Sequence, residues 1–204
     1  MTNSANQPVW HEPKVSREQL WSAHKFHGMT IWLTGLSGSG KSTIAHELAR
    51  KLTELGKFAY VLDADNVRHG LNSDLGFTDD DRAENVRRMA EVAKLFASSG
   101  AITLVPIISP FASGRQFARL IHTSDNLEFV EVHVATSLAE CEKRDTKGLY
   151  AQVKAGASIG LSGVNAPYEA PTAPEFSLCA NGESLDQCVE TLLRDVLLRC
   201  DLKR

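Results

Sequence analysis

Short apolar runs recur along the chain from Met29 onward, each bounded by polar or glycine-containing sequence. Runs of this length that are apolar at nearly every position are typical of strands buried on both faces of a sheet. They predict strands at 30–34, 58–63, 101–108 and 128–134, and a weaker one at 176–179.

Amphipathic stretches fill the intervals between these runs. Their apolar residues recur at three- and four-residue spacing, which places them on one face of a helix. Ser137 with Glu140, and Ser184 with Gln187, have the spacing of a capping box that marks a helix start. Helices are therefore predicted at 42–55, 79–98, 112–122, 137–145 and 184–199.

Strands that alternate with helices predict an α/β fold, in which a mostly parallel sheet is covered by helices on both faces. A length of 204 residues suits one such domain, which we expect over 28–204. Residues 1–27 are polar and are expected to form an extension anchored by Trp10 and Trp21. The segment 147–175 is rich in glycine and proline, lacks an apolar period and is expected to be a loop that acts as a lid.

Composition narrows the classes of partner. A formal net charge of -3 provides no basic surface for nucleic acid. No apolar run is long enough to span a membrane, and the first residues do not resemble a signal peptide, so we expect a cytoplasmic protein. The four cysteines show no metal-ligand spacing, so thiols are expected rather than a zinc site or disulfides, with redox control as a minor alternative.

The sequence Gly-Leu-Ser-Gly-Ser-Gly-Lys-Ser directly follows the first predicted strand. Glycines at this spacing let successive backbone N–H groups turn toward phosphate oxygens, and the strand before and helix after are the context of a P-loop that binds ATP. The fold is therefore predicted to be a three-layer P-loop NTPase-type domain. Lys41 would reach the β- and γ-phosphates, and Ser42 would bind Mg²⁺. The predicted ATP contacts here are Gly35, Leu36, Ser37, Gly38, Ser39, Gly40, Lys41, Ser42 and Thr43.

Two carboxylates follow the second predicted strand, at the sheet edge where parallel strands gather ligands. We predict that Asp65 orients an acceptor hydroxyl and takes its proton, and that Asp63 serves the metal ion. For Asp63 a helix N-cap is an equally good interpretation, because aspartate is a preferred capping residue. Lys41, Asp63 and Asp65 are thus candidate catalytic residues.

A group of polar donors surrounds the start of the helix predicted at 79–98. Arg82 and Asn85 share one helix face and indicate a site for a second anion. The alternative is a solvated surface in which nearby acidic residues pair with the arginines, and the charge pattern alone favours it. The group consists of Arg68, Arg82, Asn85, Arg87 and Arg88.

Several motifs together resemble the adenylylsulfate kinase family, in order along most of the chain. The resemblance implies transfer of the γ-phosphoryl group of ATP to the 3′-hydroxyl of adenosine 5′-phosphosulfate, giving 3′-phosphoadenylyl sulfate and ADP. It also implies a homodimer, and allows an ATP sulfurylase as a partner. The motifs are the P-loop, Asp63–Leu71, Gly76–Thr78, Asp81–Arg88, Ile108–Pro110, Arg144–Tyr150 and Pro167–Pro171.

The same resemblance implies roles for individual residues. Phe77 would stack on the substrate adenine, the backbone of Ile108 would contact the same substrate, and Arg144 would lie near the ATP base. The remaining substrate contacts would be Asp65, Arg68, Arg82, Asn85 and Ser109, with Lys147, Leu149 and Leu161 on the closing lid.

Ser109 matches a serine described as a phosphoserine intermediate in bacterial members of that family. In-line transfer needs only positioning and charge neutralisation, and no base is evident beside Ser109 in the sequence, so we favour direct transfer. Ser109 stays a candidate catalytic residue. The alternative is a hydroxyl that binds backbone groups before Pro110.

Two other functions fit parts of the sequence. A small P-loop kinase for another hydroxyl acceptor would explain the P-loop but not the combination of Phe77, Arg82 and Asn85. A non-catalytic nucleotide-sensing module would explain nucleotide binding, but the intact Lys41 and both carboxylates argue against it. A GTPase is disfavoured because the sequence has no Asn-Lys-x-Asp motif.

Leu161 departs from the resembled family, which places phenylalanine there as the lid half of an aromatic sandwich around the substrate adenine. Stacking of a base on an aromatic ring contributes about 1–3 kcal/mol. We therefore expect the natural protein to bind adenylylsulfate more weakly than a Leu161→Phe variant. Titration calorimetry of both proteins measures the difference, and equal affinities would rule the prediction out.

Overall fold

Five parallel strands form the centre of the computed structural model, which describes residues 8–180 and 182–201. The strand order is β2-β3-β1-β4-β5, with every pair parallel, as the alternating pattern predicted. β2 and β3 begin later and end earlier than the predicted runs 58–63 and 101–108, although the N–H groups of Leu62 and Ile107 still donate to neighbouring strands. The strands are β1 Met29–Thr34, β2 Ala59–Val61, β3 Ile102–Pro106, β4 Glu128–Val134 and β5 Phe176–Leu178.

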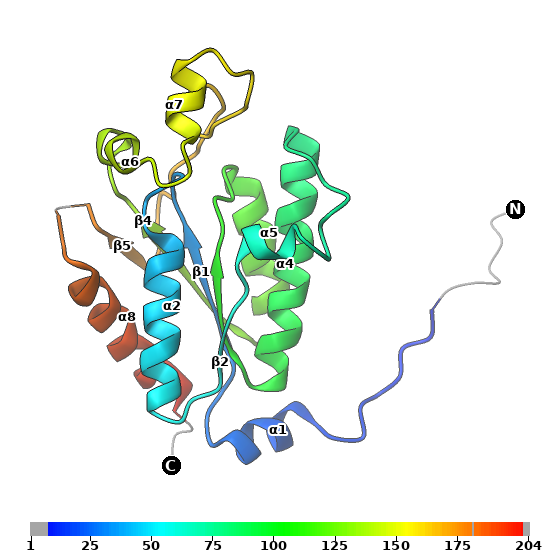
Figure 1. Cartoon of the computed structure of the whole chain (residues 1–204). Helices are drawn as coiled ribbons and strands as arrows, with labels where there is room; N and C mark the ends of the chain where they lie inside the picture. Colours follow the sequence, from blue (N-terminus) through cyan, green and yellow to red (C-terminus); the bar gives the residue numbers. More distant parts are fainter. Residues whose placement is uncertain (1–7, 181, 202–204) are drawn as a thin grey trace, which may run out of the picture.

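Helices cover both faces of this sheet and make three layers (Figure 1). In β1, Ile31 and Leu33 pack toward α2 and α8, whereas Trp32 packs toward α4 and α5. All three side chains are fully buried, which explains why this strand is apolar at successive positions. The covering helices are α2 Lys41–Glu54, α4 Asp79–Ser99, α5 Ala112–Thr123 and α8 Leu185–Cys200.

The two predicted capping boxes have different outcomes. Ser184 accepts a hydrogen bond from the N–H of Gln187, whose side chain accepts from the N–H of Ser184, so this box is complete. Ser137 caps α6 (Leu138–Arg144) by accepting from the N–H of Glu140. The Glu140 carboxylate instead accepts from Arg144 one turn later, so only half of the capping box of Ser137 and Glu140 forms.

Three helices were not predicted, and one of them lies in the segment expected to be a loop. They are α1 Arg17–His24, α3 Ala64–Val67 and α7 Leu149–Lys154. The first N–H groups of α7, on Tyr150 and Ala151, donate to the carboxylate of Asp145 at 3.1 and 2.9 Å. Because this cap comes from a residue well before the helix, the sequence carries no ordinary start signal there.

The N-terminal segment is attached through α1, at the opposite end of the molecule from α7 (Figure 1). The indole of Trp21 donates to the carbonyl of Ala97 at 3.3 Å, and Arg17 donates to Ser98 Oγ at 3.2 Å, so α1 is bound to the end of α4. The predicted anchor at Trp21 is therefore confirmed. The predicted anchor at Trp10 is wrong, because that side chain is 79% exposed.

The sequence predicts neither a membrane-spanning segment nor disulfide bonds. No helix within residues 8–180 and 182–201 is long and apolar enough to cross a membrane. All four cysteines are free thiols, as predicted. The sulfur atoms of Cys179 and Cys188 lie 3.0 Å apart.

Replacing Trp21 by alanine tests the attachment of the N-terminal segment. Loss of the hydrogen bond to Ala97 and of the half-buried ring should lower the free energy of unfolding by about 1–3 kcal/mol. Urea denaturation followed by circular dichroism measures this. The exposed Trp10 gives the matched control: Trp10→Ala should change the value by less than about 0.5 kcal/mol. Equal effects of the two substitutions would contradict the assignment.

Candidate active site

The predicted site residues gather at the carboxyl ends of the strands, beneath α6 and α7 (Figure 1). Between β1 and α2 the chain turns through Gly35 and Gly40, with φ of 150° and 106°. A Cβ on Gly35 would lie 2.6 Å from the carbonyl oxygen of Val134, so no larger residue fits there. The P-loop therefore has the backbone that its glycine spacing predicted.

Lys41, the P-loop lysine, is only 8% exposed. Its ammonium donates to the carbonyl oxygens of Gly35 at 3.0 Å and Leu36 at 2.7 Å. Burial, with a smaller contribution from the positive charge of Lys147, lowers the pKa of Lys41 to about 8. A cation desolvated to this extent gains strongly from an anionic ligand beside it.

The N-cap interpretation of Asp63 is confirmed, and its service to the metal ion stays a prediction. Its Oδ1 accepts from the N–H of Asp65 at 2.9 Å, which makes Asp63 the N-cap of α3. Its Oδ2 accepts from the hydroxyl of Ser42 at 2.7 Å. One carboxylate thus caps a helix and lies beside the P-loop serine, and this pair of oxygens is of the type that Mg²⁺ prefers.

The lid segment contacts both the P-loop and the carboxylate loop. Lys147 forms an ion pair with Asp65, between side chains that are about half exposed. The hydroxyl of Tyr150, on α7, donates to the carbonyl oxygen of Ser37 at 2.8 Å. Three predicted parts of the site, the P-loop, Asp65 and the lid, are therefore adjacent.

Leu161 belongs to an apolar cluster that joins the lid to α6. It is 4% exposed and packs with Cys141 and Tyr150, and Leu149 packs against the same cluster. The side chain of Leu161 is thus buried within the lid in this structure. Its predicted effect on substrate affinity stays a prediction.

Two arginines surround Phe77 and form no ion pair with a carboxylate in the described part of the chain. The guanidinium of Arg68 lies 4.6 Å from the centre of the Phe77 ring and donates to the carbonyl of Gly76 at 2.9 Å. Arg82 donates to the carbonyl of Phe77 at 2.9 Å and reaches the lid at Gly160. Burial lowers the pKa of Arg68. Phe77 is 69% exposed, so its ring is accessible beside the Arg68 guanidinium.

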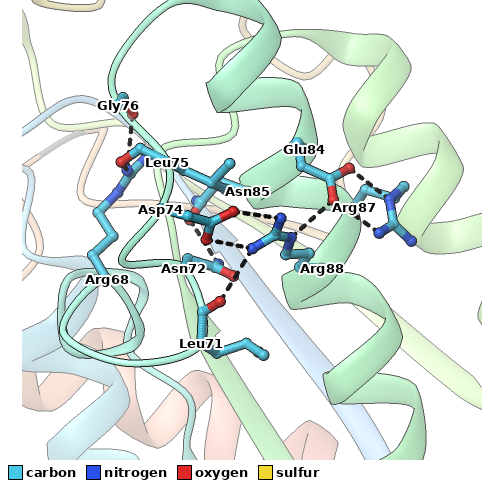
Figure 2. Close-up of polar contacts among 10 residues, drawn as sticks. All are labelled: Arg68, Leu71, Asn72, Asp74, Leu75, Gly76, Glu84, Asn85, Arg87 and Arg88. Carbon is cyan, nitrogen blue, oxygen red and sulfur yellow. Dashed lines mark hydrogen bonds and ion pairs between the residues drawn. The ribbon is translucent and has the colours of Figure 1, made fainter.

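The other two arginines of the predicted cluster are surface residues (Figure 2). Arg87 pairs with Glu84 at 2.7 Å, and Arg88 pairs with Glu84 and with Asp74 at 2.8 and 2.7 Å. For them the solvated-surface interpretation is right. Charge spacing along the sequence does not separate them from Arg68 and Arg82.

Asn85 lies on the inner side of α4 and is 5% exposed. Its Oδ1 accepts from the Nδ2 of Asn72 at 2.9 Å, as Figure 2 shows. Asn72 is fully buried and was not predicted, because a lone asparagine in a loop gives no pattern. It fixes the orientation of the Asn85 amide and leaves the Asn85 donors for other partners.

Ser109 lies in the turn after β3 and is 1% exposed, with φ of 41°. Its Oγ accepts from the indole N–H of Trp32 at 3.1 Å. The sequence predicted backbone groups as the alternative partner, but the observed partner is a side chain of β1. Ile108, before it, is half-buried, and its carbonyl accepts from Thr34 Oγ1 at 2.6 Å.

A cavity of about 510 Å³ opens beside the P-loop. Its lining includes Gly40 and Thr43 of the P-loop region, Thr136, and Arg144 at the end of α6. The predicted ATP contact Arg144 is therefore next to the P-loop.

Comparison with known proteins shows the family of this chain. The sequence model of the adenylylsulphate kinase family matches residues 27–179. The adenylyl-sulfate kinase of Prochlorococcus marinus is 46% identical over 198 residues, which cover 97% of each chain. That of Clostridium kluyveri is 49% identical over 184 residues, 90% of this chain and 91% of the relative.

Among solved structures, the chain is similar to the Mycobacterium tuberculosis APS kinase CysC in complex with AMPPNP and APS. The TM-score is 0.81 at 48% identity, over 84% of this chain and 98% of that one. The family match covers the P-loop, both carboxylates, the arginine-flanked Phe77 and the lid. The chain therefore belongs to the adenylylsulfate kinase family.

Proposed function

We propose that this protein transfers the γ-phosphoryl group of ATP to the 3′-hydroxyl of adenosine 5′-phosphosulfate, giving 3′-phosphoadenylyl sulfate and ADP. The observation that carries the proposal is the pair of adjacent anion sites. Lys41 serves one. Arg68 and Arg82, which form no ion pair with a carboxylate within residues 8–180 and 182–201, serve the other beside an exposed Phe77. A kinase for a small uncharged alcohol needs no second anion site.

On the donor side, Lys41 and the P-loop N–H groups bind the phosphates of ATP. Thr43 and Arg144 line the cavity that takes the ribose and base. The Ser42 hydroxyl and the Asp63 carboxylate are the protein oxygens that would hold Mg²⁺, which neutralises charge on the transferred group. The 2.7 Å contact between these two oxygens supports their action on one ion.

On the acceptor side, Asp65 orients the 3′-hydroxyl and takes its proton. Phe77 stacks on the adenine, and Arg68, Arg82 and Asn85 bind the phosphosulfate and ribose. The backbone of Ile108 contacts the same nucleotide. Lys147 and Leu149 bring the lid over the site, and substrate binding replaces the ion pair between Lys147 and Asp65.

Direct in-line transfer accounts for these parts without a covalent enzyme intermediate. The Ser109 hydroxyl is buried and accepts from Trp32, so a nucleophilic role would require it to leave this environment. No histidine or carboxylate lies within hydrogen-bond distance of Ser109 Oγ in the described part of the chain. We therefore assign Ser109 a structural role in the turn that borders the acceptor site.

Other expectations concern the protein's surroundings. The homodimer, the ATP sulfurylase partner and the cytoplasmic location stay predictions. A kinase for another acceptor and a nucleotide-sensing module remain the alternatives to the proposed reaction. The same assay distinguishes all three functions.

Purified protein with magnesium ATP should release ADP only when adenylylsulfate is added, and not with gluconate or shikimate. Lys41→Ala should lower kcat on the order of a hundredfold or more, because it removes charge stabilisation of the transferring group. Arg87→Ala removes a positive charge that pairs with Glu84 on the surface of α4, so it is the control for loss of a cation and should stay within about twofold. ADP release that does not depend on adenylylsulfate would contradict the proposal.

The lowered pKa of Lys41 predicts a pH dependence of ATP binding. The ammonium form binds phosphates, and it is lost in the free protein as the pH rises through about 8. The dissociation constant for magnesium ATP should therefore rise about tenfold between pH 7 and pH 9. In a Lys41→Arg variant the side chain keeps its proton throughout, so its profile should be flat. A flat profile for the natural protein, measured by calorimetry, would disprove the prediction.

A further inference from the structure

Three consecutive carbonyl groups in the turn after β3 point into the protein. The carbonyl of Ile108 accepts from Thr34 Oγ1 at 2.6 Å, that of Ser109 from Arg115 Nη1 at 2.8 Å, and that of Pro110 from the N–H of Glu169 at 2.8 Å. A carbonyl oxygen that faced a phosphosulfate would repel it. Holding all three away leaves the acceptor side of this turn free of such oxygens.

Arg115 on α5 connects this turn to the end of the lid. The side chain is 4% exposed and has three different partners. Besides Ser109, its Nη2 donates to the carbonyl of Glu169 at 2.7 Å, and its Nε donates to Glu131 on β4 at 2.8 Å. A guanidinium can donate in three directions from one rigid plane, whereas the lysine ammonium is a compact charge on a flexible stem.

The end of the lid is bound to the same turn by two further contacts. The carboxylate of Glu169 accepts from the N–H of Ala112, the first residue of α5, at 2.6 Å. The hydroxyl of Tyr168 lies 3.1 Å from Thr34 Oγ1, which itself holds Ile108. The segment that closes the lid and the turn beside the acceptor are thus one hydrogen-bonded unit.

We propose that Arg115 is a positioning residue for phosphoryl transfer. It fixes the turn at Ser109 and the end of the lid at Glu169 relative to each other. The inference rests on the proposed function and adds a role for a residue that contacts neither nucleotide. Ser109 has a left-handed φ of 41°, which a residue other than glycine keeps only when its surroundings fix it. Arg115 supplies that constraint at its carbonyl.

Arg115→Lys tests the proposal, with Arg119→Lys as the matched control. Arg119 lies one turn further along α5 and also pairs with Glu131. Its other partners are Glu175 and Phe129, which belong neither to the turn nor to the end of the lid at Glu169. Initial rates give kcat and KM for adenylylsulfate and ATP separately, and thermal unfolding reports the fold. Glu169→Ala, at an exposed position, is a second variant if Arg115→Lys does not fold. It keeps the backbone carbonyl that Arg115 binds and removes the carboxylate bond to Ala112, which holds the same end of the lid.

We expect Arg115→Lys to lower kcat/KM for adenylylsulfate at least about tenfold, with KM for ATP within about twofold, because only the acceptor side is misplaced. Glu169→Ala should act in the same direction, and Arg119→Lys should stay within about twofold. The double variant of Arg115 and Glu169 should be no worse than the poorer single variant, because both changes release one unit.

Two results would overturn the proposal. One is an unchanged kcat/KM for adenylylsulfate in folded Arg115→Lys or Glu169→Ala. The other is an equal loss in Arg119→Lys, which would mean that loss of the Glu131 ion pair alone explains the effect. The natural protein is assayed first: absence of adenylylsulfate-dependent ADP release there would disprove the proposed function itself, and with it this role for Arg115.

Discussion

The buried ammonium of Lys41 is the interaction on which the rest of the site depends. Its charge is held away from water by two P-loop carbonyls, and burial lowers its pKa to about 8. Such a charge is costly without an anion nearby and effective when one binds. The parallel sheet supports this arrangement, because the buried β1 fixes the loop that precedes Lys41, and Asp63 and Asp65 follow the nearby β2 at the same edge.

The lid joins the two halves of the site. At the start of the lid, Tyr150 is bound to the P-loop and Lys147 pairs with Asp65. In the middle of the lid, the carbonyl of Gly160 accepts from Arg82. At the end of the lid, Glu169 is bound to the turn after β3. Under the proposed function, the acceptor replaces the contacts of Lys147 and Arg82. The contacts of Tyr150 with the P-loop and of Glu169 with the turn after β3 hold the lid segment at two places.

Local sequence predicted the strands and the covering helices closely, because apolar period and capping signals act over a few residues. It also placed the P-loop and both carboxylates. It missed α7, whose cap at Asp145 lies outside the usual position. It could not separate Arg82, which reaches the lid, from Arg87, which pairs with Glu84. The hydrogen bond from Trp32 to Ser109 was not predicted, because a tryptophan in a buried strand is typical of a core.

The sequence by itself determined the order of elements, the phosphate-binding backbone and the chemical groups available, since these depend on neighbours along the chain. The tertiary structure decided which groups meet. Arg115 and Glu169 are 54 positions apart, and Trp32 and Ser109 are 77 apart, yet each pair is hydrogen-bonded. Only the packing of helices and lid onto one sheet edge brings such residues together, because no local spacing encodes a contact between distant segments.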